Sequence, residues 1–394
     1  MDINTWKLSK MKNKNILLVF HDHGMSGGTL ALLDLIGEWK KTEYNFVCLL
    51  PKKNPVLENK LKELNCNLII IRYWQAVWNL QGSSINKIKR LILLALGILN
   101  IIFHIDKIKR YNFIAVYSNT SSIYIGIIIS KLLKISHIWH IREFVSEEHG
   151  VYPLLGEKRH YKIISKYGGR IITISNSLME FYSQKIANNN IQTIYDDVSP
   201  IYYLDDISPW KDRKNNILVV GNISPGKRQD IVIRALNMVD NDDIKVYFAG
   251  RPTDNHYYLA LLEKINTFKL QNRVIFLGQV NNMNDIRKQM GIGVISSYKE
   301  AFGRVTIEGM LAGMIMIGAE DSGTKELIRD RENGFLFELD NYNELAKIIK
   351  MLNECDNNSS EKIIKEARLT SRDFIKGNCA NELIRVFREC EESV

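Results

Sequence analysis

The feature that most constrains the fold is an alternation, run through twice along the chain, of short apolar segments with longer helical patterns. Short β-branched segments between helices are typical of βαβ units built around a buried parallel sheet. The 394 residues also exceed the size at which one core usually keeps growing. The sequence therefore predicts an α/β protein of two Rossmann-like, doubly wound parallel-sheet domains. We expect strands at residues 15–20, 45–50, 68–71, 115–118, 135–141 and 170–174 in the first half, and at 216–220, 245–249, 274–277, 292–296 and 314–318 in the second.

The domain boundary is expected near residue 200. Residues 198–215 contain Pro200, Pro209 and a charged run, without helical or strand periodicity, which indicates a linker. The predicted organisation is a first domain over residues 1–197, a linker over 198–215 and a second domain over 216–377. The last segment, 378–394, is expected to form a helix that packs back on the first domain.

Composition narrows the partners. The excess of 53 Lys and Arg over 44 Asp and Glu gives a net charge of +9, which favours anionic partners. The basic residues are dispersed and no aromatic-basic motif occurs, so no nucleic acid partner is expected. The five cysteines show no CxxC spacing, which suits a reducing cytoplasm. His21 and His23 lack a third ligand of fitting spacing, so we expect no bound metal.

The apolar stretch at residues 91–105 leaves two interpretations open. It is interrupted only by Asn100 and His104 and is flanked on both sides by KIKR. A membrane-spanning helix needs about 20 apolar residues, so this stretch is too short to cross a bilayer. It is either a core helix or a helix that lies on the inner membrane face.

Glycine-containing turns follow the first strand of each half. Gly27 and Gly28 lead into a helix whose backbone N–H groups could approach a phosphate, although a plain tight turn would look the same. Residues 221–228 read GNISPGKR, close to the phosphate-binding GxxxxGK[ST] loop. Arg228 replaces the Ser/Thr that holds Mg²⁺, which argues against a nucleoside triphosphatase. A clamp of Lys227 and Arg228 on a diphosphate and solvated charges at a helix start both stay open.

The segment YKEAFGRVTIEGMLAG at residues 298–313 carries Glu300 and Glu308. A helix that starts near Gly303 would leave Glu300 in the preceding loop and Glu308 on its second turn. Carboxylates accept paired hydrogen bonds from vicinal hydroxyls of a sugar or ribose. The N–H groups of Phe302 and Gly303 could bind further oxygens at the helix start. The alternative is two surface glutamates.

These motifs together resemble the retaining GT-B glycosyltransferases of family 4, the glycosyl transferases group 1, over roughly residues 14–385. The resemblance rests on EAFGxxxxEGMxAG, GTKELI and ENGFLF in the second half, on the glycine loop after the first strand and on the histidine of WHIREF. It implies a GT-B fold whose two domains face a central cleft. One departure is Asn222, which stands where the family usually has an arginine.

The resemblance implies a role for each matching residue. Glu300 would face the donor sugar, Glu308 would hold the ribose, Lys227 would grip the diphosphate and His140 would line the reaction centre. Without the family, a histidine such as His140 is more often a packed core residue. We assign catalysis to His140 and Glu300, and the acceptor to Asn119 and Arg142. The donor-site residues expected are Gly27, Gly28, Asn222, Lys227, Arg228, Gly250, Arg251, Val280, Phe302, Gly303, Glu308, Gly323 and Thr324.

The implied activity is transfer of a sugar from a nucleotide-sugar substrate, with a UDP-sugar favoured over a GDP- or dTDP-sugar, and with retention of anomeric configuration. No cofactor or metal is expected. The acceptor is expected to be a lipid-linked glycan met at the inner membrane face during surface polysaccharide or capsule assembly. A nucleotide-sugar epimerase of the same fold and a non-enzymatic polyanion-binding protein are the alternatives.

Overall fold

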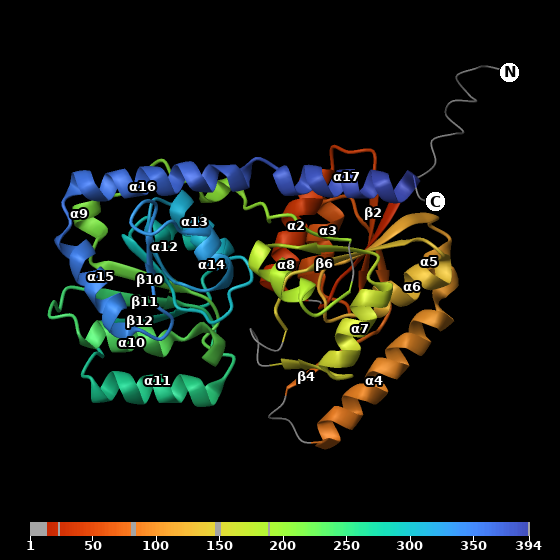
Figure 1. Ribbon diagram of the computed structural model, residues 1–394, viewed down its shortest axis with the longest axis horizontal. Helices are drawn as coiled ribbons and strands as arrows, with labels where there is room; N and C mark the ends of the chain where they lie inside the picture. Colours follow the sequence, from red (N-terminus) through yellow and green to blue (C-terminus); the bar gives the residue numbers. More distant parts are fainter. Residues whose placement is uncertain (1–13, 23, 80–83, 146–150, 188–189, 393–394) are drawn as a thin grey trace, which may run out of the picture. The chain divides into compact units, whose positions relative to one another are not determined.

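The structure is a computed structural model that describes residues 14–22, 24–79, 84–145, 151–187 and 190–392 (Figure 1). His23 lies outside the described residues. The chain divides into two compact units. Unit 1 contains the residues up to Asp197 and those from Gly377 onward, and unit 2 contains Val198–Lys376.

Unit 1 is built on a seven-stranded sheet in the order β3-β2-β1-β5-β6-β8-β9, and every neighbouring pair is parallel. The strands are β1 (Asn15–Val19), β2 (Asn45–Leu50), β3 (Asn67–Ile70), β5 (Phe113–Ser118), β6 (Ser136–Ile141), β8 (Arg170–Thr173) and β9 (Ile191–Thr193). The helices are α2 (Gly27–Trp39), α3 (Pro55–Glu63), α4 (Ser84–Phe103), α5 (Ile105–Lys109), α6 (Ile125–Leu133), α7 (Glu157–Tyr167), α8 (Asn176–Ser183) and α17 (Asn378–Glu392). A separate antiparallel pair joins β4 (Val77–Asn79) to β7 (Val151–Pro153).

Strand β1 shows why the central strands read as unbroken apolar runs. Ile16 and Leu18 pack into the core on one face of the sheet, and Leu17 and Val19 pack into the core on the other. Helices cover both faces (Figure 1), so successive side chains are all buried. Helix α17 closes one of these cores, where Trp39 Nε1 donates to Ala380 O at 3.1 Å.

Unit 2 repeats the architecture with a six-stranded parallel sheet in the order β12-β11-β10-β13-β14-β15. The strands are β10 (Asn216–Val220), β11 (Lys245–Ala249), β12 (Val274–Gly278), β13 (Ile292–Ile295), β14 (Ile315–Ala319) and β15 (Phe335–Phe337). The α-helices are α9 (Trp210–Arg213), α10 (Gln229–Asn237), α11 (Asn255–Thr267), α12 (Met283–Arg287), α13 (Arg304–Leu311), α14 (Ser322–Leu327), α15 (Tyr342–Glu354) and α16 (Asn357–Ser371). The 3-10 helices are η1 (Pro200–Tyr202), η2 (Pro225–Lys227) and η3 (Arg372–Ile375). The prediction of two parallel α/β sheets is confirmed.

Two expectations about the chain's organisation need correction. Residues 198–215 are not a linker, because Trp210 and Arg213 are each only 2% exposed and Val198 N donates to Phe374 O at 2.7 Å within unit 2. The apolar stretch 91–105 is not a core helix either. Residues 91–103 of it belong to α4, most of whose large apolar side chains are exposed. None of the described helices combines the length and the apolar character needed to cross a bilayer.

Candidate functional site

The loops at the carboxyl edge of the unit 2 sheet are held side by side by backbone hydrogen bonds. Gly221 N donates to Ala249 O at 2.9 Å, and Gly250 N donates to Gly278 O at 2.8 Å. A Cβ on Gly250 would lie 1.9 Å from Gly221 O, so only glycine fits there. The loops after β10, β11 and β12 therefore form one continuous edge, the position at which open α/β sheets bind ligands.

An ion pair joins the lysine and the first glutamate of the two motifs at this edge. Lys227 ends η2, and its Nζ lies 2.8 Å from Glu300 Oε2. Ser296 Oγ, just beyond β13, donates to Lys227 O at 2.8 Å and ties the two loops together. Both charged side chains keep part of their surface exposed, 30% for Lys227 and 18% for Glu300. A cation and a carboxylate therefore share one solvent-accessible position.

Arg228 does not join this pair. Its backbone is left-handed, with φ of 50°, and it precedes the first turn of α10. Its guanidinium pairs with Asp340 and lies 3.5 Å from Asp230 Oδ1. The two cations of the expected clamp thus have separate carboxylate partners in this structure, and their joint action on a diphosphate stays a prediction.

The second glutamate has a buried cation of its own, which the sequence analysis missed. Arg287, at the end of α12, pairs through Nη2 with Glu308 Oε2, and its side chain is 1% exposed. The ring of Tyr202 stacks 4.8 Å from the guanidinium carbon. The Glu308 side chain is 12% exposed. No motif surrounds Arg287, so only the tertiary contact between Arg287 and Glu308 reveals its role in orienting Glu308.

The start of α13 is held in place by α14. Gly303 precedes α13 with φ of +97°, a conformation that favours glycine. Gly323 N donates to Glu300 O at 2.9 Å, and a Cβ on Gly323 would lie 2.7 Å from Phe302 Cα. The N–H of Gly323, one of the expected donor-site residues, therefore supports the Glu300 loop. The side chains of Phe302 and Thr324 are each 1% exposed.

The remaining donor-site residues of unit 2 lie at the same edge. Asn222 and Arg251 follow β10 and β11 and are exposed, and Val280 follows β12 and is half-buried. The structure thus places all of the expected second-half residues around one sheet edge, apart from the side chain of Arg228.

In unit 1 the glycine turn is tied to the loop after β5. Ser26 caps α2, where its Oγ accepts from Thr29 N. Gly27 and Gly28 begin the helix, and Asn119 Nδ2 donates to Gly28 O at 2.8 Å. Asn119 is only 1% exposed. It therefore holds two loops of the carboxyl edge together.

Arg142, which follows β6, lies in a buried network with Asn119. Its Nε donates to Asn119 Oδ1 at 2.7 Å, and its Nη1 pairs with Asp196 Oδ2. Burial alone would lower the pKa of Arg142, but the Asp196 carboxylate and other neighbours raise it overall, so the guanidinium stays charged. The two residues assigned to the acceptor are thus buried and bonded to each other.

His140 is also interior to unit 1, with no exposed surface. Its Nδ1 contacts the Tyr117 hydroxyl and lies 3.3 Å from Arg142 Nη2. An arginine can only donate, so Nδ1 accepts and the proton sits on Nε2. Burial, together with the Arg142 charge, lowers the pKa of His140 well below its ordinary value. His140 is thus a buried, neutral imidazole, and its place at a reaction centre stays a prediction.

The neighbouring Asp197 predicts a pH effect on stability. Burial raises the pKa of Asp197 to about 6, although Ala380 N donates to its Oδ2 at 3.1 Å and works against this. An unfolded Asp titrates near pH 4. The folded state therefore binds the proton more tightly, and the resulting stability is present below about pH 4 and lost as the pH rises through about 6. Asp197→Asn should gain roughly 2–4 °C in melting temperature relative to wild type between pH 4 and pH 7.

Differential scanning fluorimetry at successive pH values checks this expectation. Asp205→Asn, on an exposed residue of unit 2, is the matched control. A melting-temperature difference between Asp197→Asn and wild type that stays the same at every pH would contradict it.

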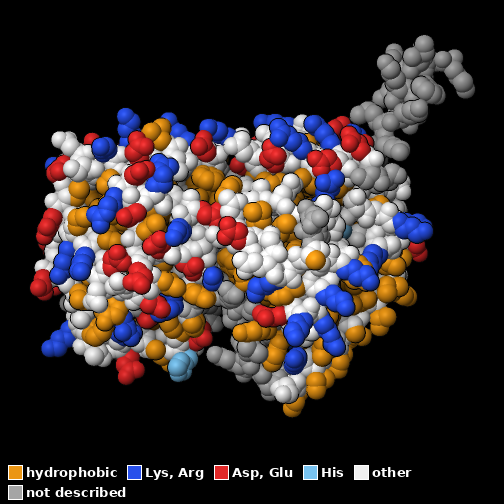
Figure 2. All heavy atoms as spheres, in the orientation of Figure 1, with side chains coloured by type: hydrophobic (Ala, Val, Ile, Leu, Met, Phe, Trp, Pro, Cys, Tyr) orange, Lys and Arg blue, Asp and Glu red, His pale blue; other side chains and the backbone are white. Residues whose placement is uncertain are grey.

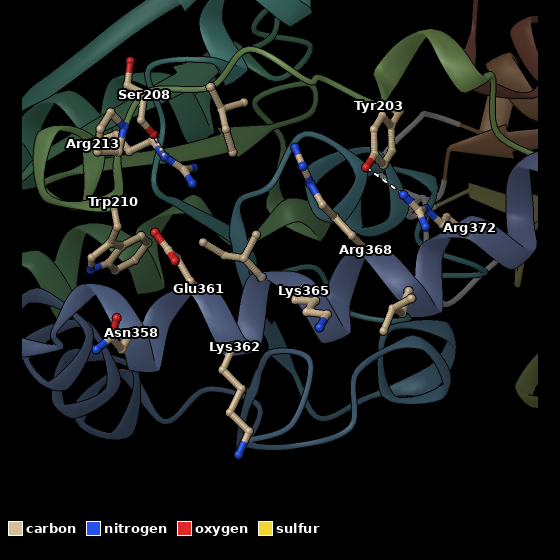
Figure 3. A pocket seen from close by; sticks show the side chains of 14 residues that line it. Tyr203, Ser208, Trp210, Arg213, Asn358, Glu361, Lys362, Lys365, Arg368 and Arg372 are labelled. Carbon is tan, nitrogen blue, oxygen red and sulfur yellow. Dashed lines mark hydrogen bonds between the residues drawn. The ribbon is translucent and has the colours of Figure 1, made fainter.

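Two further features lie apart from the motif residues. A hollow of about 850 Å³ in unit 2 is lined by several residues between 203 and 213 and by others of α16, among them Trp210, Arg213 and Arg368 (Figure 3). None of the motif residues lines it. Among the described residues, no group of three or more His, Cys, Asp or Glu side chains is placed to hold a metal ion.

The sheet edge that carries Lys227, Glu300 and Glu308 falls within a segment that matches a known family. Residues 204–370 match the model of the glycosyl transferases group 1. In this segment the chain is similar to the glycosyl transferases group 1. The matched segment covers most of unit 2, from just after η1 to the last turn of α16.

Curated relatives align with part of the chain only. N-acetyl-alpha-D-glucosaminyl L-malate synthase of Bacillus anthracis is 28% identical over 178 residues, which cover 43% of this chain and 46% of the relative. N-acetylgalactosamine-N,N'-diacetylbacillosaminyl-diphospho-undecaprenol 4-alpha-N-acetylgalactosaminyltransferase of Campylobacter jejuni is 28% identical over 170 residues, 43% of this chain and 45% of the relative. The chain thus spans less than half the length of these relatives.

Solved structures match over almost the whole chain. Anabaena HepE in complex with UDP and glucose superposes with a TM-score of 0.78 at 20% identity, over 95% of this chain and 99% of HepE. Likeness at this identity concerns the fold. The prediction of a GT-B fold, made of two parallel α/β sheets, is confirmed.

Proposed function

We propose that the protein is a glycosyltransferase that moves a sugar from a nucleotide-sugar donor to a glycan acceptor. The observation that carries the proposal is a pair of carboxylates in the segment similar to the glycosyl transferases group 1. Each carboxylate forms an ion pair with a cationic side chain. Glu300 pairs with Lys227, and Glu308 pairs with Arg287, at one sheet edge. Such an edge offers hydrogen-bond acceptors for hydroxyls beside a positive charge for a phosphate.

The roles follow from this geometry. Glu308, one oxygen of which is held by Arg287, would accept hydrogen bonds from the ribose hydroxyls. Glu300 would orient the donor sugar, and Lys227 would offset the charge of the diphosphate as the bond to the sugar breaks. Lys227 already faces a carboxylate in the free protein, so donor binding would add the phosphate as a second anionic partner.

We further propose that the transfer retains the anomeric configuration, as the family resemblance implies. The acceptor hydroxyl oxygen attacks the anomeric carbon on the face from which the diphosphate departs. The bond between that carbon and the phosphate oxygen breaks, its electron pair goes to the phosphate, and the phosphate takes the acceptor proton. The products are the glycoside and a nucleoside diphosphate, and no enzyme nucleophile is needed.

A UDP-sugar is the donor that we favour, because the similar fold of HepE has been solved with UDP. A lipid-linked glycan is the acceptor that we favour, because the Campylobacter relative is named for a diphospho-undecaprenol substrate. These choices place the protein at the cytoplasmic membrane face in surface polysaccharide or capsule assembly.

The decisive test is donor binding by wild type and by Glu308→Gln. UDP-, GDP- and dTDP-glucose are added separately, and thermal stabilisation and slow release of nucleoside diphosphate are measured. A donor at 100 times its dissociation constant stabilises the folded state by about 2.7 kcal/mol. Glu308→Gln should weaken binding roughly 10- to 100-fold, since each hydrogen bond to a charged group contributes about 1.5–3 kcal/mol.

Glu263→Gln, an exposed residue on α11, is the matched control and should bind like wild type. If no nucleotide sugar stabilises the wild-type protein, the proposed donor site is wrong. Release of UDP and a free, epimerised sugar without acceptor would instead indicate an epimerase.

The same assay repeated in EDTA tests the proposal that the reaction needs no metal. Lys227 supplies the positive charge at the phosphate in this scheme, so UDP release should persist at a comparable rate. Loss of activity in EDTA with recovery on adding Mg²⁺ or Mn²⁺ would refute it.

A further inference from the structure

Helix α4 presents an apolar face that the described residues of unit 1 leave uncovered. We call it the α4 outer face. It comprises the exposed side chains of Ile85, Ile88, Ile92, Leu96, Leu99, Ile102 and Phe103, which are 45% to 83% exposed. At 100° per residue these seven positions fall within an arc of about 120°. They therefore form one continuous stripe along the helix.

The opposite face anchors α4 to unit 1. Leu94, Gly97 and Ile101 are its buried residues. A Cβ on Gly97 would lie 3.1 Å from Tyr73 Cα, so glycine permits the close approach. Asn100 Nδ2 donates to Arg72 O at 3.0 Å. Because the inner face is already packed, the outer face is available to an external partner.

Basic residues lie near both ends of the stripe. Between residues 84 and 112 the chain has six Lys or Arg residues and one acidic residue, Asp106. The cations are Lys87, Lys89, Arg90, Lys107, Lys109 and Arg110. Figure 2 shows Lys and Arg side chains beside a band of hydrophobic side chains along this edge of the molecule. Lys87 Nζ lies 4.9 Å from the ring centre of Trp78, which sets an aromatic side chain beside the start of the helix.

We infer that the α4 outer face docks on an anionic lipid bilayer, with the helix lying in the plane of the headgroups. Apolar side chains would enter the headgroup boundary while the flanking cations contact lipid phosphates. A second copy of this chain fits less well, because a symmetric contact along α4 would bring these cations against their own copies. The inference deepens the proposed function and rests on it for its purpose, since a lipid-linked acceptor would be met at that surface.

Vesicle co-sedimentation tests the inference. The full chain is mixed with phosphatidylglycerol-containing vesicles and with pure phosphatidylcholine vesicles, at low and at high salt. We expect binding to the anionic vesicles that weakens as salt rises. Leu96→Glu/Leu99→Glu should lower the partition coefficient at least about tenfold, because two carboxylates would enter the headgroup boundary. Val56→Glu/Leu259→Glu, which makes the same charge change at two exposed apolar residues on α3 and α11, should bind like wild type.

Thermal stabilisation by UDP is recorded for every variant as a separate readout of the donor site. A variant that loses vesicle binding but keeps its response to UDP supports the α4 outer face. The inference is overturned if wild type does not bind anionic vesicles, or if Leu96→Glu/Leu99→Glu still binds them. Neither result bears on the proposed donor site. Light scattering could instead find that wild type is a dimer and that Leu96→Glu/Leu99→Glu is a monomer. That result would assign the α4 outer face to a contact with a second copy and would also overturn the inference.

Discussion

Lys227→Met is expected to lower the rate of sugar transfer by about 10²- to 10³-fold, the usual loss when one electrostatic stabiliser of a transition state is removed. The Arg228 guanidinium pairs with Asp230 and Asp340, whereas the Nζ of Lys227 is bonded to Glu300 at the sheet edge. Without it, charge that develops on the departing diphosphate has no lysine partner. Steady-state release of nucleoside diphosphate with acceptor present measures the effect.

The loss should appear mainly in kcat, because the interaction strengthens as the leaving group gains charge. Stability should change by less than about 1 kcal/mol, as for other partly exposed ion pairs. Lys347→Met, on an exposed lysine of α15, is the matched control and should keep wild-type kinetics. A Lys227→Met enzyme within threefold of wild type would show that the diphosphate is held elsewhere.

Arg142→Leu is expected to destabilise unit 1 by about 3–5 kcal/mol, the range found when one partner of a buried ion pair is removed. Asp196 is 2% exposed and would be left as a buried carboxylate without its cation. Asn119 would lose the Nε donor at the same time. Guanidinium titration followed by tryptophan fluorescence measures the loss, since Trp39 and Trp139 report on the interior of unit 1.

The double variant Arg142→Leu/Asp196→Leu provides the control for this expectation. Removing both charges leaves no unpaired ion, so much of the lost stability should return. If Arg142→Leu costs less than about 1 kcal/mol, the network is not a stability element. A role of Arg142 and Asn119 in binding the acceptor would then be favoured.

The sequence predicted the strands well because parallel strands buried on both faces read as unbroken apolar runs. Residues 216–220 and 245–249 coincide with β10 and β11. The short strands β9 and β15 were missed, since three residues carry too little periodicity to be recognised. The linker prediction failed because prolines and charges mark an irregular segment, yet Trp210 and Arg213 of that segment are buried in unit 2.

The site was predicted in part for a similar reason. The motif spacing predicted that Lys227, Glu300 and Glu308 follow the ends of strands. In a parallel sheet these ends lie at the same edge, so the three residues come close together. Spacing says nothing about which way a side chain turns, so it did not indicate that Arg228 pairs with Asp230 and Asp340. The cation of Glu308, Arg287, comes from a separate short helix and carries no local signal.

The sequence by itself determined the two α/β sheets, the group 1 motifs and the sheet edge on which they meet, because each depends on periodicity and local order along the chain. Only the tertiary structure decided that His140 is interior, that Arg142 is neutralised by Asp196, and that α4 buries one face and exposes the other. The physical reason is that burial, charge pairing and pKa depend on neighbours brought together from distant parts of the chain, and sequence spacing does not specify them.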